Sequence, residues 1–113
     1  MKDNMKIDLT KPEAFEELKA VQALMLVMDP ELGINIVDMG LIYHLDLTDP
    51  SCIVVTMTLS SAYCPMGDSI VQGIENTLQQ QFPNKAIVIN LVWEPIWTPD
   101  RISEEGKILL DRG

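Results

Sequence analysis

Cysteine, histidine and positive charge are scarce in this sequence. Its 113 residues include two cysteines and one histidine, and eight basic side chains face seventeen acidic ones, for a formal net charge of -9. A closed structural zinc site needs four Cys or His ligands, and no CxxC is present, so we do not expect such a site within one chain. Nucleic acids and anionic membranes attract positive fields, so neither is an expected partner.

Long hydrophobic runs are also missing. No apolar run reaches the ~18–20 residues that a membrane helix needs. The first eighteen residues, "MKDNMKIDLTKPEAFEEL", are acidic and hold no uninterrupted apolar segment, so a secretory signal is not expected. We therefore expect a cytoplasmic protein whose two thiols are reduced.

The remaining composition is that of an ordinary globular protein, with 47% hydrophobic and 22% charged residues. The length fits a single domain spanning residues 1–113, long enough for one modest core.

Three segments have the spacing of amphipathic helices. The first is expected to begin at a capping box of Thr10 and Glu13 and to end at Asp29-Pro30. Its predicted apolar stripe is Phe15, Leu18, Val21, Met25 and Met28. The second is expected from Pro65 to about residue 82, with Ile70, Ile74 and Leu78 on one face. A short third helix is expected to start at Ser103.

Three further segments, residues 41–47, 52–60 and 86–93, read as strands, and residues 31–40 read as a loop. Alternation in the second places Ile53, Val55, Met57 and Leu59 on one face. A short turn joins the first two strands, which predicts an antiparallel hairpin. The order α-β-β-α-β-α predicts an α+β fold: a small two-layer sandwich with helices on one face of a mostly antiparallel three-stranded sheet.

Cys64 is the leading candidate for chemistry. It directly precedes Pro65, where the strand-like run gives way to the second helix. At a helix start, unpaired backbone N–H groups and the helix dipole favour the thiolate, which is the form that binds soft metals and acts as a nucleophile. The alternative is a small buried side chain that happens to precede a helix. Spacing alone leaves both open.

Three carboxylates, Glu31, Asp38 and Glu94, lie at element boundaries and could gather near Cys64. Each taken alone fits an ordinary turn residue. Asp38 is the least ordinary, because "IVDMGLI" places an acid between two apolar runs.

Cysteine, histidine and tryptophan supply the remaining candidates. Cys52 begins a strand, where packing is the better interpretation. His44 could form a Cys–His pair with Cys64, but its mid-strand position favours a solvated side chain. Trp93 is expected on the core face, whereas Trp97 begins an exposed-looking loop that could cover a site.

Three segments taken together resemble a known family. "DPELGINIVDMGLIY", "VTMTLSSAYCPMGDSI" and "LVWEPIWTPDRISEEGKILL" are similar to the signature segments of the PaaD/SufT-like (MIP18-type) iron–sulfur cluster assembly domains. The resemblance covers about residues 13–110. It implies a small α+β fold and a non-enzymatic role in maturing iron–sulfur proteins, as an adaptor or transient carrier that delivers clusters to apo-proteins.

The resemblance also implies roles for particular residues. The reactive cysteine of the family falls on Cys64, its acidic "DxGL" position on Asp38, and its closing serine on Ser103. The "DPE" element includes Glu31, and the "WxPxWT" element falls on Trp93, Pro95, Trp97 and Thr98. Ser60 keeps a hydroxyl that could hydrogen-bond the thiolate, whereas Tyr63 replaces a glycine found in many members.

A stable cluster commonly takes four thiolate ligands, and the chain offers two cysteines. An iron ion or cluster on Cys64 would therefore be transient and shared with a partner, and none is expected to be stably bound. The expected partners are the iron–sulfur assembly machinery, apo-client proteins and a second copy of the chain in a homodimer.

Two alternatives remain. One is an accessory subunit of a phenylacetate-type ring-oxygenase system, which the absence of extra cysteines before Gly113 disfavours. The other is a thiol enzyme with Cys64 as nucleophile and His44 as base.

Overall fold

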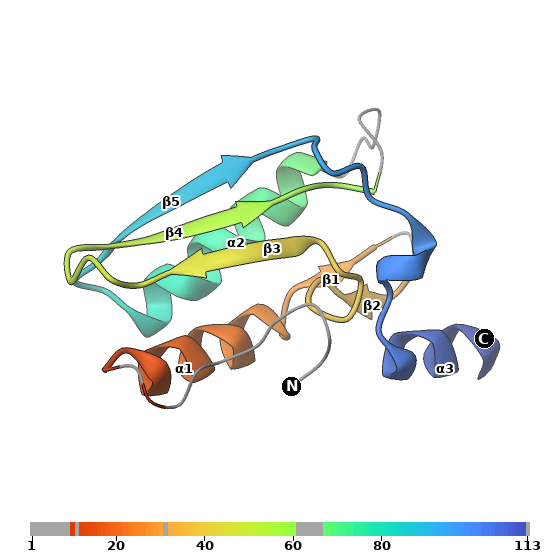
Figure 1. The fold of residues 1–113 in the computed structure, drawn as a ribbon, viewed down its shortest axis with the longest axis horizontal. Coiled ribbons are helices and arrows are strands. Elements are labelled where there is room, and N and C mark those ends of the chain that lie inside the picture. Colours follow the sequence, from red (N-terminus) through yellow and green to blue (C-terminus); the bar gives the residue numbers. More distant parts are fainter. Residues whose placement is uncertain (1–9, 11, 31, 61–66, 113) are drawn as a thin grey trace.

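The structure is a computed structural model, and it describes residues 10, 12–30, 32–60 and 67–112, without the side chains of residues 109–112. The elements follow one another along the chain as shown in Figure 1. They are α1 (Ala14–Leu24), β1 (Met28–Asp29), β2 (Ile34–Asn35), β3 (Ile42–Asp46), β4 (Cys52–Met57), α2 (Gly67–Gln81), β5 (Ala86–Leu91), a 3-10 turn (Pro99–Arg101) and α3 (Glu104–Arg112).

The predicted α+β class is confirmed, but the predicted sheet is only partly right. The main sheet has the order β3-β4-β5, and β3 and β4 form the expected antiparallel hairpin. β5 instead pairs parallel to β4, so "mostly antiparallel" is wrong. The reason is the connection: α2 carries the chain back along the sheet, and a strand that follows such a crossover runs parallel to the first.

A second, two-stranded antiparallel sheet was missed by the sequence analysis. It pairs β1 with β2, in the segment that was expected to be a helix end followed by a loop. Each strand has two residues, too few to show a period of two.

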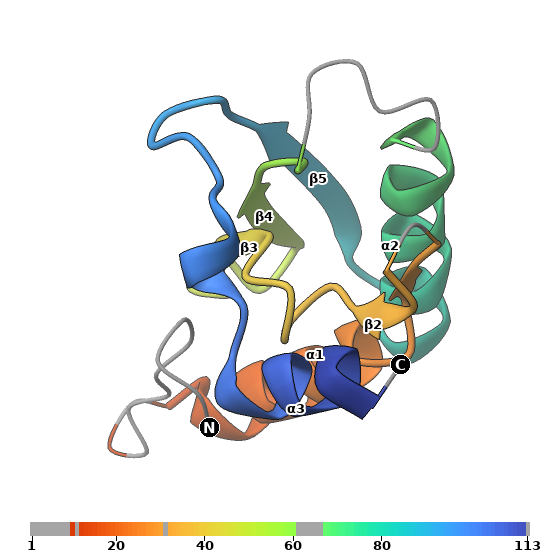
Figure 2. The same ribbon diagram turned by 90° about the vertical axis from the view of Figure 1, so that its right-hand side faces the viewer.

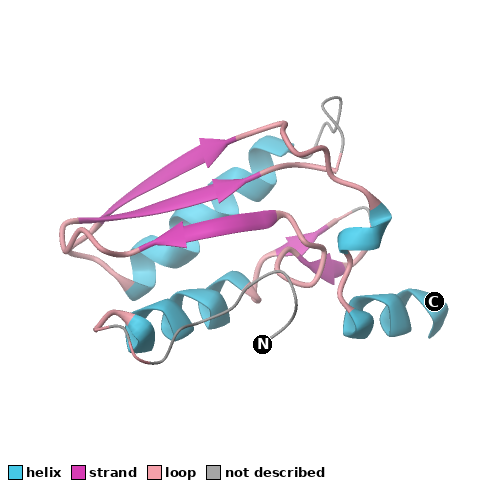
Figure 3. Cartoon of the chain, viewed as in Figure 1, coloured by secondary structure: helices cyan, strands magenta, loops and turns pink. Residues whose placement is uncertain are grey.

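Two helices lie together on one side of the main sheet. α1 packs against α2, and α2 packs against β5 (Figure 2). α3 departs from the expected arrangement, because it lies beyond β2 at the end of the molecule and does not cover the sheet (Figure 1). The loop after β5 crosses to that end before α3 begins (Figure 3).

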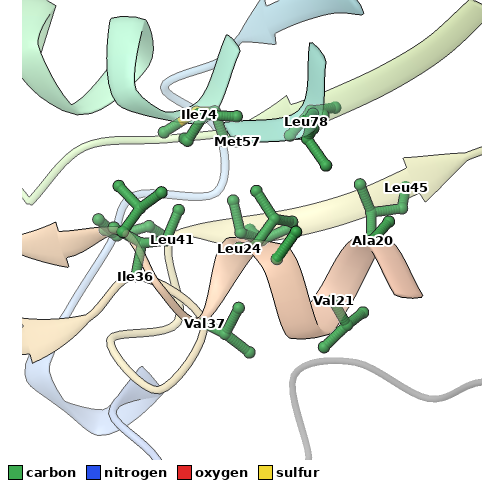
Figure 4. Close-up of a cluster of buried hydrophobic side chains, with 14 of the residues drawn as sticks. Ala20, Val21, Leu24, Ile36, Val37, Leu41, Leu45, Met57, Ile74 and Leu78 are labelled. Atoms are coloured by element: carbon green, nitrogen blue, oxygen red, sulfur yellow. The ribbon is translucent and has the colours of Figure 1, made fainter. Parts of the chain in front are cut away.

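The core lies between the sheet and these two helices. Ile53, Val55 and Met57 of β4 are buried and alternate with half-buried neighbours, as the sequence predicted. The predicted face of α2 is also buried, and its Ile74 and Leu78 lie above side chains of α1 and β3 (Figure 4). Among the described residues, no helix is long and apolar enough to cross a membrane.

The predicted stripe of α1 is mostly wrong. Phe15 is 80% exposed and Met28 51% exposed, whereas Ala20, Val21 and Leu24 are fully buried. The alanine lets the helix approach its neighbours closely, which a larger side chain would prevent. The predicted helix start at Thr10 is also wrong, because α1 begins after Glu13, which occupies the N-cap position without a side-chain capping hydrogen bond.

Candidate functional site

A pocket of about 330 Å³ opens at the end of β4. Because β4 and β5 are parallel, both strands finish at the same end of the sheet, and the segments that follow them leave the sheet there. The backbone N–H of Val92 donates to the Met57 carbonyl at 2.8 Å, which holds the two segments together as the strands end. The pocket, called here the β4-end pocket, is lined by Thr58, Leu59, Ser60, Trp93, Glu94, Ile96 and Trp97.

Three of the residues singled out from the sequence meet at the β4-end pocket. Ser60 and Trp97 are half-buried and Glu94 is exposed, so a hydroxyl, an indole and a carboxylate border one hollow. The Trp97 indole N–H donates to the Met39 carbonyl oxygen at 2.7 Å, which fixes the ring. Trp93 was expected in the core but is 41% exposed, because β5 ends at Leu91 and the chain then turns away from the sheet.

Thr58 is a pocket residue that sequence reasoning did not identify. Its side chain is only 1% exposed, and its Oγ1 has no hydrogen-bond partner in the described part of the chain. Leaving a buried hydroxyl unmatched costs about 1–3 kcal/mol, so such a group calls for an explanation. In the predicted strand 52–60, alternation places Ile53, Val55, Met57 and Leu59 on one face and therefore Thr58 on the other. Its burial beside residues 93–97 is a long-range effect that no local pattern reports.

Asp38 and Ser103 form a second cluster, away from solvent. Both are buried, and the Ser103 hydroxyl donates to Asp38 Oδ1 at 2.7 Å. The Asn35 amide donates to Asp38 Oδ2 at 2.7 Å, so both carboxylate oxygens accept a hydrogen bond. Ser103 Oγ also accepts from the Gly106 N–H at 3.1 Å and thereby caps α3, whose start at Ser103 was predicted.

The chain on either side of this cluster is equally close-packed. The Ser103 N–H donates to the Asp38 carbonyl at 2.7 Å. Gly40 has φ +79°, and a Cβ added there would fall on the carbonyl oxygen of Arg101. We call Asp38, Gly40, Trp97, Arg101 and Ser103 the Asp38 clamp. It joins the segment before β3 to the segment after β5, so two of the three signature segments pack on each other.

A further pair of contacts ties β3 to the same loop. The Tyr43 hydroxyl donates to the Pro95 carbonyl at 2.8 Å, and the Arg101 guanidinium lies 4.8 Å from the centre of the Tyr43 ring. Burial raises the pKa of Tyr43, and the charge of Arg101 opposes that shift. The phenol is therefore neutral and able to donate over the physiological range.

Cys52 lies at the start of β4, at the opposite end of the strand from the pocket. It is half-buried, and desolvation followed by the negative charge of Asp49 raises the pKa of its thiol. A raised pKa keeps the thiol protonated at neutral pH, which suits packing and not metal binding. His44 is exposed on β3 opposite Thr56, as its mid-strand position predicted.

Cys64 and Glu31 lie outside the described residues, so the structure gives no geometry for them. The same holds for any approach of Asp38 to Cys64. Within residues 12–30, 32–60 and 67–112, no group of three or more His, Cys, Asp or Glu side chains is placed to hold a metal ion.

Comparison with known proteins settles the family. The model of the family described as "Iron-sulfur cluster assembly protein" matches residues 17–88, well over half of the chain. The chain belongs to this family. The matched region includes Asp38, Ser60 and Cys64, and it ends before Glu94, Trp97 and Ser103.

Similar proteins come from several bacteria. The chain is 41% identical over 85 residues to the Fe-S protein maturation auxiliary factor SufT of Staphylococcus aureus, covering 75% of this chain and 97% of that one. It is 39% identical over 98 residues to the factor YitW of Bacillus subtilis, covering 87% and 95%. A solved domain of unknown function, DUF59, from Bacillus anthracis superposes with a TM-score of 0.82 at 38% identity, covering 92% and 98%.

Proposed function

We propose that this protein is an iron–sulfur protein maturation factor, a non-enzymatic adaptor or transient carrier that delivers clusters to apo-proteins through the thiol of Cys64. The observation that carries the proposal is family membership with relatives named as maturation auxiliary factors. The β4-end pocket supports it, because Ser60 of that pocket precedes Cys64 by only four residues in the chain.

The contrast between the two cysteines supports the choice of thiol. Cys52 has a raised pKa and lies at the far end of β4. Cys64 is the other cysteine of the chain, next to a proline and shortly before α2 begins at Gly67. A thiol near the start of a helix is held as thiolate by the helix dipole.

Cluster binding would then be shared. One thiolate from this chain leaves a cluster in need of further ligands, since four are common. We propose that the client, the assembly machinery or a second copy supplies them, which makes the bound cluster cargo and not a resident cofactor. Asp38 is less suited to replace a thiolate, because both of its carboxylate oxygens already accept hydrogen bonds.

The β4-end pocket would hold this cargo or the client segment beside the thiol. Trp93, Ile96 and Trp97 supply apolar walls. Thr58 Oγ1 has no hydrogen-bond partner among the described residues, so we propose it as a donor to a thiolate or a cluster sulfide, and such hydrogen bonds tune clusters.

The same proposal covers assembly and location. We expect a cytoplasmic homodimer that meets the iron–sulfur assembly machinery and apo-clients. We propose the face of the sheet opposite the helices as the surface for a second copy, because Val54 and Val88 lie side by side on it and Val88 is 45% exposed.

The test exchanges one cysteine at a time in cells. Cys64→Ser is expected to lower the activity and iron content of cluster-dependent enzymes several-fold, while the melting temperature of the purified protein stays unchanged. Cys52→Ser is the matched control, because it makes the same chemical change at the protonated thiol, and it should leave those enzymes at normal activity. Normal client activity in the Cys64→Ser strain would overturn the proposal.

A further inference from the structure

The main sheet ends at β5 with an open edge. β5 pairs with β4, and no described strand pairs with its other side. The N–H of Ala86 donates to Ser51 and that of Val92 to Met57, so the even-numbered residues of β5 direct their N–H groups toward β4. Alternation along a strand then directs the N–H groups of Ile87, Ile89 and Leu91 to the open edge.

The side chains of those same three residues line a groove of about 480 Å³ between β5 and α2. Ile87 and Ile89 are only half-buried and Leu91 is 39% exposed, so α2 covers this edge incompletely. Val71 completes the apolar floor. A fourth strand beside β5 would pair with the free backbone groups and cover the apolar side chains at once, which neither a small ligand nor a helix would do.

Charge indicates what kind of strand fits. Two charged side chains line the groove, Asp68 and Glu75 of α2, and both are exposed acids. The whole chain carries a formal net charge of -9. A second copy would bring like charge to this wall, whereas a segment with lysine or arginine beside its apolar residues would be complementary.

We propose that the β5 edge and its groove bind an extended segment of a partner protein, which adds a fourth, parallel or antiparallel strand and directs apolar and basic side chains toward α2. Recognition by strand addition takes affinity from main-chain hydrogen bonds and specificity from alternate side chains. β5 leads within two residues to Trp93 of the β4-end pocket, so a segment bound here would lie alongside the strand that ends at that pocket. The inference does not depend on what the pocket holds.

The test uses a dye-labelled peptide, acetyl-Lys-Thr-Val-Thr-Val-Thr-Lys-amide, whose lysines and valines share one face of a strand. Binding to the full chain is followed by fluorescence anisotropy at low salt and by amide exchange in NMR spectra. We expect saturable binding in which the amides of Ile87, Ile89 and Leu91 become protected from exchange. Binding without protection of these three amides would overturn the proposal, as would equal binding of a peptide with glutamate in place of lysine.

A second test reverses the charge of the two acids that line the groove. The Asp68→Lys/Glu75→Lys variant is expected to bind the peptide about tenfold more weakly. Asp100→Lys/Glu104→Lys is the matched control, because it makes the same charge change at two exposed acids outside the groove. Glu104 lies in the first turn of α3 as Asp68 lies in the first turn of α2, so the effect on the helix start is matched as well. Equal weakening in both variants would overturn the proposal. So would a dimer that protects the same three amides without peptide, since the occupant would then be a second copy.

Discussion

Two regions built from signature residues differ in how completely their polar groups are satisfied. In the Asp38 clamp, both oxygens of Asp38 accept hydrogen bonds and Ser103 both donates and accepts. In the β4-end pocket, Thr58 Oγ1 is buried without a partner in the described part of the chain, and Glu94 faces solvent. A satisfied cluster stabilises a fold, whereas an unsatisfied one is available to another molecule.

Trp97 belongs to both regions. Its indole N–H donates to the carbonyl of Met39, which lies between the clamp residues Asp38 and Gly40 in the chain, and Trp97 also lines the pocket. The clamp therefore holds one wall of the pocket in place. Substitutions should separate the two roles, since changes in the clamp act on stability and changes in the pocket act on function.

The largest loss of stability is expected from Gly40→Ala. Its left-handed φ of +79° and the Arg101 carbonyl that a Cβ would strike both oppose a side chain. Strain and overpacking together should cost about 3–5 kcal/mol in free energy of unfolding, measured by urea denaturation. Gly33→Ala is the control, with φ +69° but open space, and should cost about 1–2 kcal/mol. Equal losses would mean that the contact with Arg101 does not matter.

A smaller loss is expected from Asp38→Asn. An asparagine must turn its NH2 toward either the Ser103 hydroxyl or the Asn35 amide, both of which donate to Asp38. The cost should be about 1–3 kcal/mol by urea denaturation, with cluster delivery by the folded fraction unchanged. Asp100→Asn, at an exposed site, should cost less than about 0.5 kcal/mol. Delivery lost beyond the folded fraction would assign Asp38 to the functional site instead.

The smallest effect on stability is expected from Thr58→Val, which replaces the Thr58 hydroxyl with a methyl group of similar size. Stability should rise by about 1 kcal/mol, the lower end of the cost of an unmatched buried hydroxyl, because Thr58 Oγ1 has no hydrogen-bond partner among the described residues. Delivery of clusters to apo-clients should nevertheless fall. Thr56→Val is the control, because it makes the same change at a half-buried position within β4, outside the pocket. Full delivery by Thr58→Val would show that the Thr58 hydroxyl does not contribute to cluster delivery.

Local patterns predicted well where one face of an element is buried and the other is open. The alternation of β4 and the four-residue spacing of Ile70, Ile74 and Leu78 report such faces directly. The stripe of α1 failed because its buried face includes Ala20, and an alanine carries little hydrophobic signal against Phe15. The predicted antiparallel direction of β5 was wrong, because the crossover through α2 sets the direction of that strand and its own residues do not.

The candidate site residues also divide into those that local patterns predict and those that they do not. Glu94 was identified at a predicted element boundary, Trp97 at the start of a predicted loop and Ser60 through the family resemblance. The parallel strands bring the segments that hold them together. The bond between Asp38 and Ser103 joins residues 65 positions apart, and the burial of Thr58 beside the loop 93–97 is also long-range. No spacing along the chain reports either contact.

The central claim is that Cys64, and not Cys52, is the working thiol. The most direct test is the pH dependence of alkylation of both cysteines in one sample of the native protein, with each modified peptide quantified by mass spectrometry. The raised pKa of Cys52 means that less of it is thiolate at any given pH, so its rate should rise only at alkaline pH.

We expect Cys64 to react with an apparent pKa well below the ~8.5 of a free cysteine, at pH values where Cys52 does not react. Unfolding the protein in urea should bring the two rates together. If the apparent pKa of Cys64 in the native protein equals or exceeds that of Cys52, Cys64 is not the activated thiol.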